Sequence, residues 1–212
     1  MLKLYKYVKR IFDILFSAIL LILAAIPMLI VAIAIKIEDK GPVIYKSVRM
    51  GKDCKPFNTY KFRSMKTNRK ELDGSLSHEQ MVTKVGKFIR KTSLDELPQL
   101  FNILKGEMSF IGPRPWIPAY YEWFTPEQKR RADVLPGISG LAQVKGRNGI
   151  NIFKKIEYDL EYVDNMSLKM DIKCIWLTIV TVLKKDNAEI SEQGIKEEIE
   201  ELKEQEGYIK AM

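Results

Sequence analysis

The sequence predicts an α+β fold: a small, mainly helical globular domain with short β strands, anchored to a membrane at its N-terminal end. Three observations support this prediction. Residues 14–35 carry no charged side chain. Residues 41–65 alternate short β-rich pieces with Gly and Pro turns, and helix-period apolar patterns follow. We expect a membrane segment over 1–36, a folded domain over 37–185 and an acidic tail, helical or frayed, over 186–212.

The uncharged run has the length of a membrane span but the flanks of a re-entrant segment. As a helix it would be about 33 Å long, close to the roughly 30 Å of a hydrocarbon core. Pro27 lies inside it, where proline removes a hydrogen bond and kinks a helix. Basic residues lie on both sides of the run, and basic flanks favour the cytoplasmic side of a membrane. We expect a Pro-kinked re-entrant helix, with a simple span as the alternative, and a pairing of Arg10 with Asp13 at the interface.

Shorter elements follow along the chain. Residues 41–65 predict two short strands or a hairpin, and 67–80 a polar loop. Helices are expected near 84–90, after Ser93 and from Pro126, with a Gly/Pro loop over 107–118 and turns around 137–149. An aromatic cluster belongs either at the membrane interface or in a pocket: Trp116, Tyr120, Tyr121, Trp123 and Phe124.

Two later segments favour amphipathic helices. Residues 171–185 place apolar side chains on one helical face, which suits an interfacial helix or, equally, a core helix; they are Ile172, Ile175, Trp176, Ile179, Val180 and Leu183. The acidic tail predicts a solvated helix whose stripe of Ile195, Ile199 and Leu202 could meet a partner.

Composition narrows the class of partner. The net charge of +8 indicates an anionic one: nucleic acid, an acidic membrane or a phosphorylated substrate. No helix-turn-helix or RNA-recognition signature occurs and the basic residues are dispersed, so we expect no nucleic-acid partner. His78 is the only histidine, which disfavours histidine catalysis. Cys54 and Cys174 lack metal-ligand spacing, and we expect free thiols.

The stretch TSLDELPQLFNIL places Asp95 beside Glu96. One interpretation is a capping box, in which Ser93 and Glu96 satisfy each other's backbone donors. The other assigns the two acids to chemistry, as Mg²⁺ ligands and nucleophile on an anionic, diphosphate-like substrate. Candidate cations for such a substrate occur nearby. One is Arg114, which Pro113 and Pro115 bracket and whose backbone they restrict. The full candidate substrate-binding set is Lys61, Arg63, Arg90, Arg114, Gln143 and Arg147.

Longer motifs carry a resemblance. The strings LDELPQLFNILKGEMSFIGPRP, LPGISGLAQVKGRN and KRIFDI resemble the bacterial monotopic phosphoglycosyl transferases, over about residues 9–183. The resemblance implies transfer of a phosphosugar from a UDP-sugar to polyprenyl (undecaprenyl) phosphate, with Mg²⁺ and release of UMP. It implies a place on the cytoplasmic face of the bacterial inner membrane, in contact with membrane lipids, and makes 37–185 the catalytic domain.

The resemblance also implies roles for single residues. Asp95 matches the nucleophile and Glu96 the second acid at the metal. Arg114 matches the arginine beside the phosphates, and Arg10 with Asp13 the pair at the base of the membrane helix. The family's Ser-Pro kink is Ile26-Pro27 here. A non-catalytic, membrane-anchored phosphate- or lipid-binding module is the rival function. The sugar, the glycan pathway, the lipid length and a possible homodimer are not determined by the sequence.

Overall fold

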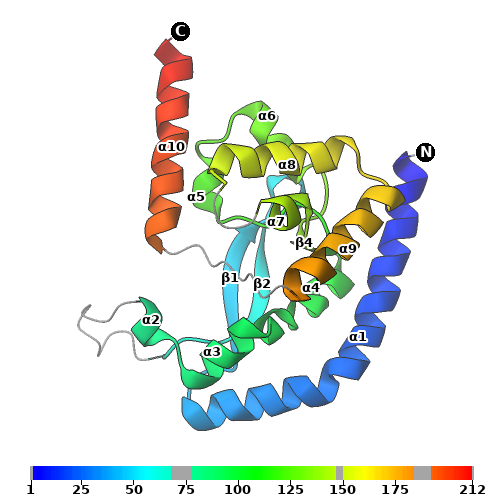
Figure 1. Ribbon diagram of the computed structural model, residues 1–212, viewed down its shortest axis with the longest axis vertical. Helices are drawn as coiled ribbons and strands as arrows, with labels where there is room; N and C mark the ends of the chain where they lie inside the picture. Colours follow the sequence, from blue (N-terminus) through cyan, green and yellow to red (C-terminus); the bar gives the residue numbers. More distant parts are fainter. Residues whose placement is uncertain (1, 68–77, 147–149, 184–191, 212) are drawn as a thin grey trace.

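A long N-terminal helix and a compact body make up the computed structural model, which describes residues 2–67, 78–146, 150–183 and 192–211. Helix α1 (Leu2–Glu38) contains Pro27, and Figure 1 shows it bent, with one arm beside the body and the other beneath it. The remaining elements are mostly short helices with two small pairs of strands. The mainly helical fold with short strands is therefore as predicted.

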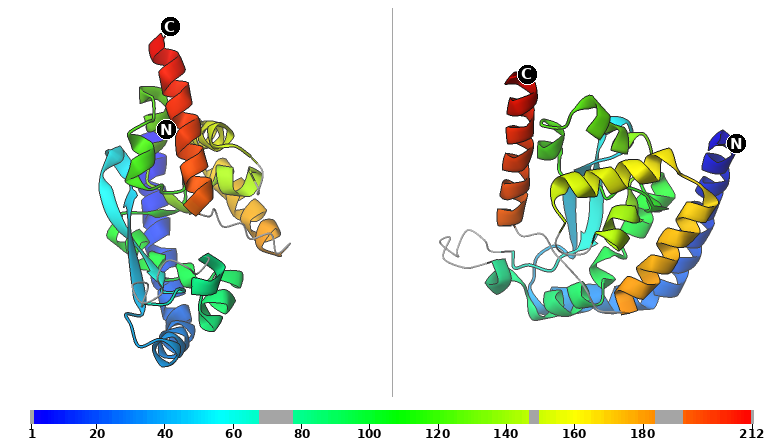
Figure 2. Two further views of the ribbon diagram at one scale, coloured as in Figure 1. Left: turned by 90° about the vertical axis from the view of Figure 1, so that its left-hand side faces the viewer. Right: turned by 45° about the horizontal axis from the view of Figure 1, so that its top comes forward.

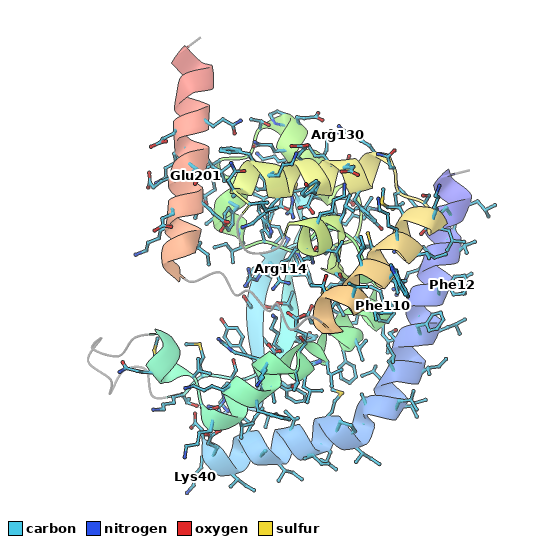
Figure 3. All side chains as sticks on the ribbon, viewed as in Figure 1. Phe12, Lys40, Phe110, Arg114, Arg130 and Glu201 are labelled. Carbon is cyan, nitrogen blue, oxygen red and sulfur yellow. The ribbon has the colours of Figure 1, made fainter. Side chains whose placement is uncertain are left out.

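Helix α1 packs one side against the body and leaves the other side uncovered. Asp13, Ser17, Val31 and Ile35 are buried, and Leu21 and Met28 pack against the body partly buried, while most large apolar side chains of α1 are exposed. Figure 3 shows one of these, Phe12, pointing away from the body. By length and composition α1 could cross a membrane, and only 11% of its most apolar window is buried. A core helix of a soluble protein would be mostly buried, so α1 does not have that role.

The expected hairpin is present. Strands β1 (Ile44–Met50) and β2 (Pro56–Phe62) pair antiparallel, with Ile44 opposite Phe62. A short 3₁₀ turn, η1 (Lys52–Cys54), joins them. Asn102 then fastens a helix to β2, because its side chain accepts from the Tyr60 N–H at 3.0 Å and donates to the Asn58 carbonyl at 2.7 Å. These two hydrogen bonds fix the position of this helix relative to the hairpin.

The other elements complete the body. The helix expected near 84–90 begins after Thr83, whose hydroxyl accepts from the Gly86 N–H at 2.9 Å. The polar loop expected over 67–80 lies largely outside the described residues. The bounds are α2 (His78–Met81), α3 (Lys84–Lys91), η2 (Leu94–Glu96), α4 (Gln99–Lys105), β3 (Ser109–Ile111), α5 (Pro118–Tyr121), α6 (Pro126–Lys129), η3 (Arg130–Ala132), β4 (Gly137–Ser139), α7 (Leu141–Lys145), α8 (Ile152–Asp164), α9 (Leu168–Leu183) and α10 (Glu192–Ala211).

The aromatic cluster belongs to the core rather than to an interface or a pocket. Trp116, Tyr120, Tyr121 and Phe124 are buried together, and Trp123 packs against them partly buried. The tail prediction also needs correction. Helix α10 lies beside α5 (Figures 1 and 2), and its apolar stripe closes this same cluster, with Leu202 fully buried and Ile195 and Ile199 partly buried. The partner of the stripe is therefore the chain's own body.

Helix α9 presents a free apolar face, as the interfacial interpretation expects. Ile172, Ile175, Trp176 and Ile179 are exposed, Trp176 by 65%. On the opposite side Asp171 is buried and accepts hydrogen bonds from Tyr5 of α1, at 2.6 Å, and from Lys9. Cys174 on the other side is buried in the core, so α9 packs on the body and leaves this one apolar face uncovered. The starts of α1 and α9 are joined through Asp171.

Candidate functional site

The two adjacent acids occupy a strained turn rather than a regular helix start. Asp95 and Glu96 end η2, and Ser93 before it adopts a left-handed conformation with φ 56°. The Ser93 side chain makes no capping hydrogen bond, so the capping-box interpretation is wrong in this structure. A non-glycine residue at positive φ costs roughly 1–3 kcal/mol and is found preferentially at functional sites. Asp95 is nearly buried, with 8% of its surface exposed.

Glu96 meets two cations from different elements. The Lys61 ammonium at the end of β2 lies 2.6 Å from Glu96 Oε1, and the Arg114 guanidinium lies 3.7 Å from the same oxygen. Burial alone would raise the pKa of Glu96, but Lys61 and Arg114 outweigh it and hold the pKa below the ordinary value. Glu96 is therefore a carboxylate at neutral pH. A carboxylate and two cations from distant parts of the chain converge here.

A small parallel strand pair, which the sequence did not reveal, places Arg114. Strand β3, which lies within the expected loop over 107–118, pairs with β4, and backbone hydrogen bonds to β4 continue past the end of β3. The Gly112 N–H donates to Ser139 O at 2.9 Å, and the Gly137 N–H donates to Pro113 O at 3.0 Å. A Cβ on Gly137 would lie 2.2 Å from the Gly112 nitrogen, so only glycine allows this approach. Arg114 follows at once and stays half exposed, beside the β1–β2 hairpin in Figure 3.

Arg49 is a neighbour of Arg114 that sequence reasoning counted only as a flanking positive charge. It lies at the end of β1, opposite Phe57. The next residue, Met50, donates its N–H to the Trp116 carbonyl at 2.8 Å. Burial lowers the pKa of Arg49, and repulsion from Arg114 adds to that effect. No carboxylate within the described residues pairs with it. Two neighbouring guanidiniums favour an anionic ligand.

The remaining predicted cations and the amide lie in different surroundings. Arg63 is buried and bonds Asp39, Thr67 and the Pro42 carbonyl, which ties the end of α1 to the body. Arg90 donates to the Ser64 hydroxyl at 2.8 Å. Gln143 donates to the Ile138 carbonyl at 3.3 Å, while its buried Oε1 has no hydrogen-bond partner among the described residues. Arg147 lies outside the described residues. Lys61 and Arg114 are the predicted cations for which the structure shows a contact with Glu96.

Arg10 and Asp13 do not pair with each other, contrary to expectation. Arg10 instead donates to the carbonyls of Ile103 at 2.5 Å and Leu104 at 2.8 Å, at the C-terminal end of α4. Asp13 accepts from the Phe110 N–H at 3.2 Å, at β3. One turn separates the two residues, and each contacts the element it faces. Together they dock α1 onto α4, which follows the acid pair, and onto β3, which precedes Arg114.

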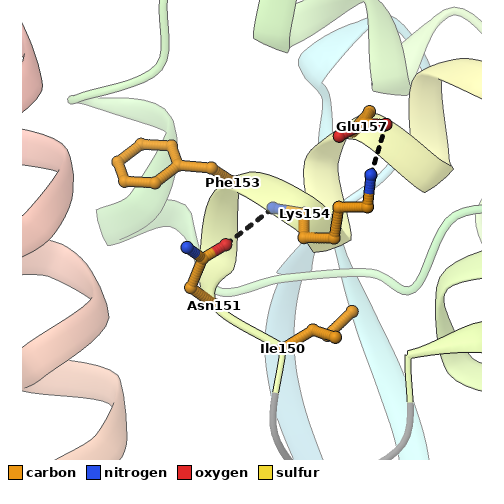
Figure 4. A pocket seen from close by; sticks show the side chains of 5 residues that line it. All are labelled: Ile150, Asn151, Phe153, Lys154 and Glu157. Carbon is orange, nitrogen blue, oxygen red and sulfur yellow. Dashed lines mark hydrogen bonds and ion pairs between the residues drawn. The ribbon is translucent and has the colours of Figure 1, made fainter.

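An open hollow of about 480 Å³ lies away from the acid pair, at the start of α8. In Figure 4 its polar side chains already bond one another: Asn151 accepts from the Lys154 N–H, and Lys154 pairs with Glu157. No predicted site residue in the described part of the chain lines it.

The donor set bears on Mg²⁺. Among the described residues no group of three or more His, Cys, Asp or Glu side chains could hold a metal by itself. Mg²⁺ in phosphate-processing sites commonly takes one or two carboxylates and completes its shell with substrate phosphates and water. Asp95 and Glu96, with Lys61 and Arg114 near Glu96, fit that arrangement.

Comparison with known proteins gives the family. Residues 4–185 match the family model described as bacterial sugar transferase. The chain belongs to the bacterial sugar transferase family. The match includes α1, both strand pairs, the acid pair and α9, and it ends before α10.

Named relatives of this bacterial sugar transferase agree with that assignment. It is 44% identical over 175 residues to the uncharacterized sugar transferase EpsL of Bacillus subtilis (strain 168), covering 82% of this chain and 87% of EpsL. It is 44% identical over 181 residues to the UDP-glucose:undecaprenyl-phosphate glucose-1-phosphate transferase of Klebsiella pneumoniae, covering 81% of this chain and 39% of that protein. The undecaprenyl-phosphate galactose phosphotransferase of Salmonella typhimurium is 40% identical over 200 residues, 86% of this chain and 42% of that protein. The chain thus spans less than half of these last two relatives.

Proposed function

We propose that this bacterial sugar transferase moves a phosphosugar from a UDP-sugar to a membrane polyprenyl phosphate, giving polyprenyl-diphosphate-sugar and UMP. The observation that carries the proposal is the acid pair, held in a strained turn and faced by Lys61 and Arg114. The names of the relatives, which act on undecaprenyl phosphate with glucose or galactose, support the reaction class. Relatives with both sugars are about equally similar, so the sugar is left open.

The proposed chemistry has two steps at one phosphorus. A carboxylate oxygen of Asp95 attacks the phosphorus that bears the sugar, the P–O bond to UMP breaks, and UMP leaves with that oxygen. The polyprenyl phosphate oxygen then attacks the same phosphorus, and the Asp95 carboxylate leaves. Splitting one transfer in this way is nucleophilic catalysis, which gives ping-pong kinetics.

Charge explains why the acids need their neighbours. Two like charges 4 Å apart repel by about 4 kcal/mol at an effective dielectric of 20, which opposes the approach of Asp95 to a diphosphate. Arg114, with Arg49 beside it, offers positive charge to the substrate, and Lys61 holds Glu96 in place. Mg²⁺ held by Asp95 and Glu96 would supply further charge neutralisation of the diphosphate.

The lipid substrate agrees with the uncovered apolar surfaces. The exposed faces of α1 and α9 provide a surface for membrane lipids. Basic residues on both sides of the α1 run favour a re-entrant helix whose two ends face the cytoplasm at the bacterial inner membrane. A polyprenyl phosphate held in that leaflet would present its headgroup on the side of the acid pair.

Intact-protein mass spectrometry tests the nucleophile. Wild-type protein mixed with UDP-glucose or UDP-galactose, without lipid acceptor, should gain the mass of one hexose phosphate and release UMP. Asp95→Asn keeps the shape of the side chain but supplies a far weaker nucleophile, so both signals should vanish. Asp133→Asn, at an exposed aspartate, is the matched control and should behave as wild type. Glu96→Gln should weaken Mg²⁺ dependence with the fold retained.

The same experiment separates the rival function. A non-catalytic, membrane-anchored phosphate-binding module would bind UDP-sugars but gain no covalent mass and release no UMP. An adduct that persists on Asp95→Asn would instead leave the transfer standing and remove Asp95 from the nucleophile role.

A further inference from the structure

A fully buried arginine lies directly behind the Arg114 loop. Arg131 is 2% exposed, and its Nε and Nη2 donate to Asp159 Oδ2 at 3.0 Å and 2.5 Å. Its Nη1 donates to the Tyr121 hydroxyl at 2.8 Å, and its guanidinium lies 4.1 Å from the centre of the Trp116 ring. These three hydrogen bonds and the ring contact hold the guanidinium in one orientation.

One further bond leads from this group to the site. Arg131 Nη2 also donates to the backbone carbonyl of Arg114 at 2.7 Å. Pro113 and Pro115 on either side have no N–H, so the loop has few backbone donors with which to fasten itself. The loop carbonyls can still accept hydrogen bonds, and Arg131 binds the central one, that of Arg114. Because Trp116 stacks on the same guanidinium, the loop is held on both sides of Pro115.

We propose that Arg131, held by Asp159, is a positioning residue that fixes the backbone of Arg114 and so aims the Arg114 guanidinium at the substrate diphosphate. The inference rests on the proposed function. Its charge is neutralised by Asp159 and its ring contacts exclude water, so it does not touch substrate itself. It acts through the carbonyl that it binds. The exposed neighbour Arg130, paired with Glu127 and Asp164, has no such contact.

A double-mutant cycle on UDP binding to the full chain in nanodiscs tests the inference. Arg114→Lys loses two-pronged phosphate binding and should raise the Kd for UDP about tenfold. Arg131→Lys cannot hold Asp159, Tyr121 and the Arg114 carbonyl together, and a loosened loop should also raise the Kd about tenfold. If Arg131 acts through Arg114, the double variant should equal Arg114→Lys within about twofold. Arg130→Lys is the matched control and should bind UDP as wild type does.

A second variant guards against misfolding of Arg131→Lys. Tyr121→Phe removes one anchor of Arg131 without burying an unpaired charge. It should raise the Kd for UDP about two- to threefold in the wild-type background and leave it unchanged in the Arg114→Lys background. If instead the fold-changes in the Kd for UDP multiply in both cycles, Arg131 and Tyr121 act independently of Arg114. That result would overturn the positioning role and leave the proposed function intact. Wild-type protein that binds no UDP would overturn the proposed function and this inference with it.

Discussion

Arg10→Met should uncouple the membrane helix from the helix that follows the acid pair. Arg10 donates to two carbonyls in the last turn of α4, that of Leu104 and that of Ile103, which also accepts from the Gly106 N–H at the C-cap; its charge also complements the helix dipole. A hydrogen bond from a charged donor contributes about 1.5–3 kcal/mol. Since Arg10 is only partly buried, we expect a loss of about 3 kcal/mol for the pair of bonds. For a chain of this size that lowers Tm by roughly 6–12 °C.

Thermal unfolding in nanodiscs, followed by circular dichroism, measures this loss. Arg10→Lys keeps the charge but reaches one carbonyl at a time, so its Tm should fall about half as far. Lys6→Met removes a charge from the same helix, one turn earlier, where the side chain is exposed. It is the matched control and should leave Tm unchanged. An Arg10→Met protein that melts within about 2 °C of Lys6→Met would refute the docking role.

Three further outcomes are expected. Single cysteines introduced at Lys3 and Lys40 should both resist an impermeant reagent added outside intact cells, and labelling at Lys3 alone would mean that α1 spans. Burial would raise the pKa of Asp39, but its bonds from the Thr67 and Arg63 groups hold the pKa below the ordinary 3.8. Its contribution to stability is therefore complete above about pH 5 and lost as pH falls through the folded pKa, so the stability deficit of Asp39→Asn should shrink between pH 5 and 3. Burial raises the pKa of the Cys174 thiol to about 11, so maleimide at pH 7 should label Cys54 and spare Cys174 until the protein unfolds.

The sequence was most informative where the structure depends on local pattern. The hairpin over 44–62 follows from turn residues between β-rich runs, and the apolar length of α1 follows from composition. Two cysteines without ligand spacing are indeed free thiols. The approach of Arg114 to Glu96 was accessible because one motif string carries both residues, whereas Lys61 lies outside these strings and was named only as a candidate cation.

It was least informative where tertiary contacts decide which charges meet. Arg130 and Arg131 are adjacent and chemically identical, yet one is on the surface and one is fully buried. Arg63 meets Asp39 rather than the acid pair. Strands β3 and β4 have three residues each, too few for a period to be read.

The dependence of Ser93 on tertiary context gives the same lesson on a smaller scale. Its sequence fits a capping box, because the pattern records only residue types and spacing. The left-handed backbone that the structure imposes there turns the hydroxyl away from that role. Local rules fail at positions where strain is kept for function, and this position precedes the two acids.

The packing of α10 on the aromatic core affects how the chain matures. A chain emerges N-terminus first during synthesis, so α1 can reach lipid while the last segment is still being made. Until α10 arrives, Tyr120 and Phe124 lack the cover that Leu202 provides. A nascent chain would therefore expose two apolar surfaces. Lipid would cover the one on α1, and α10 would later cover the one on the aromatic core. A ribosome stalled before residue 192 would leave the second surface bare, and with it a point at which chaperones or proteases can act.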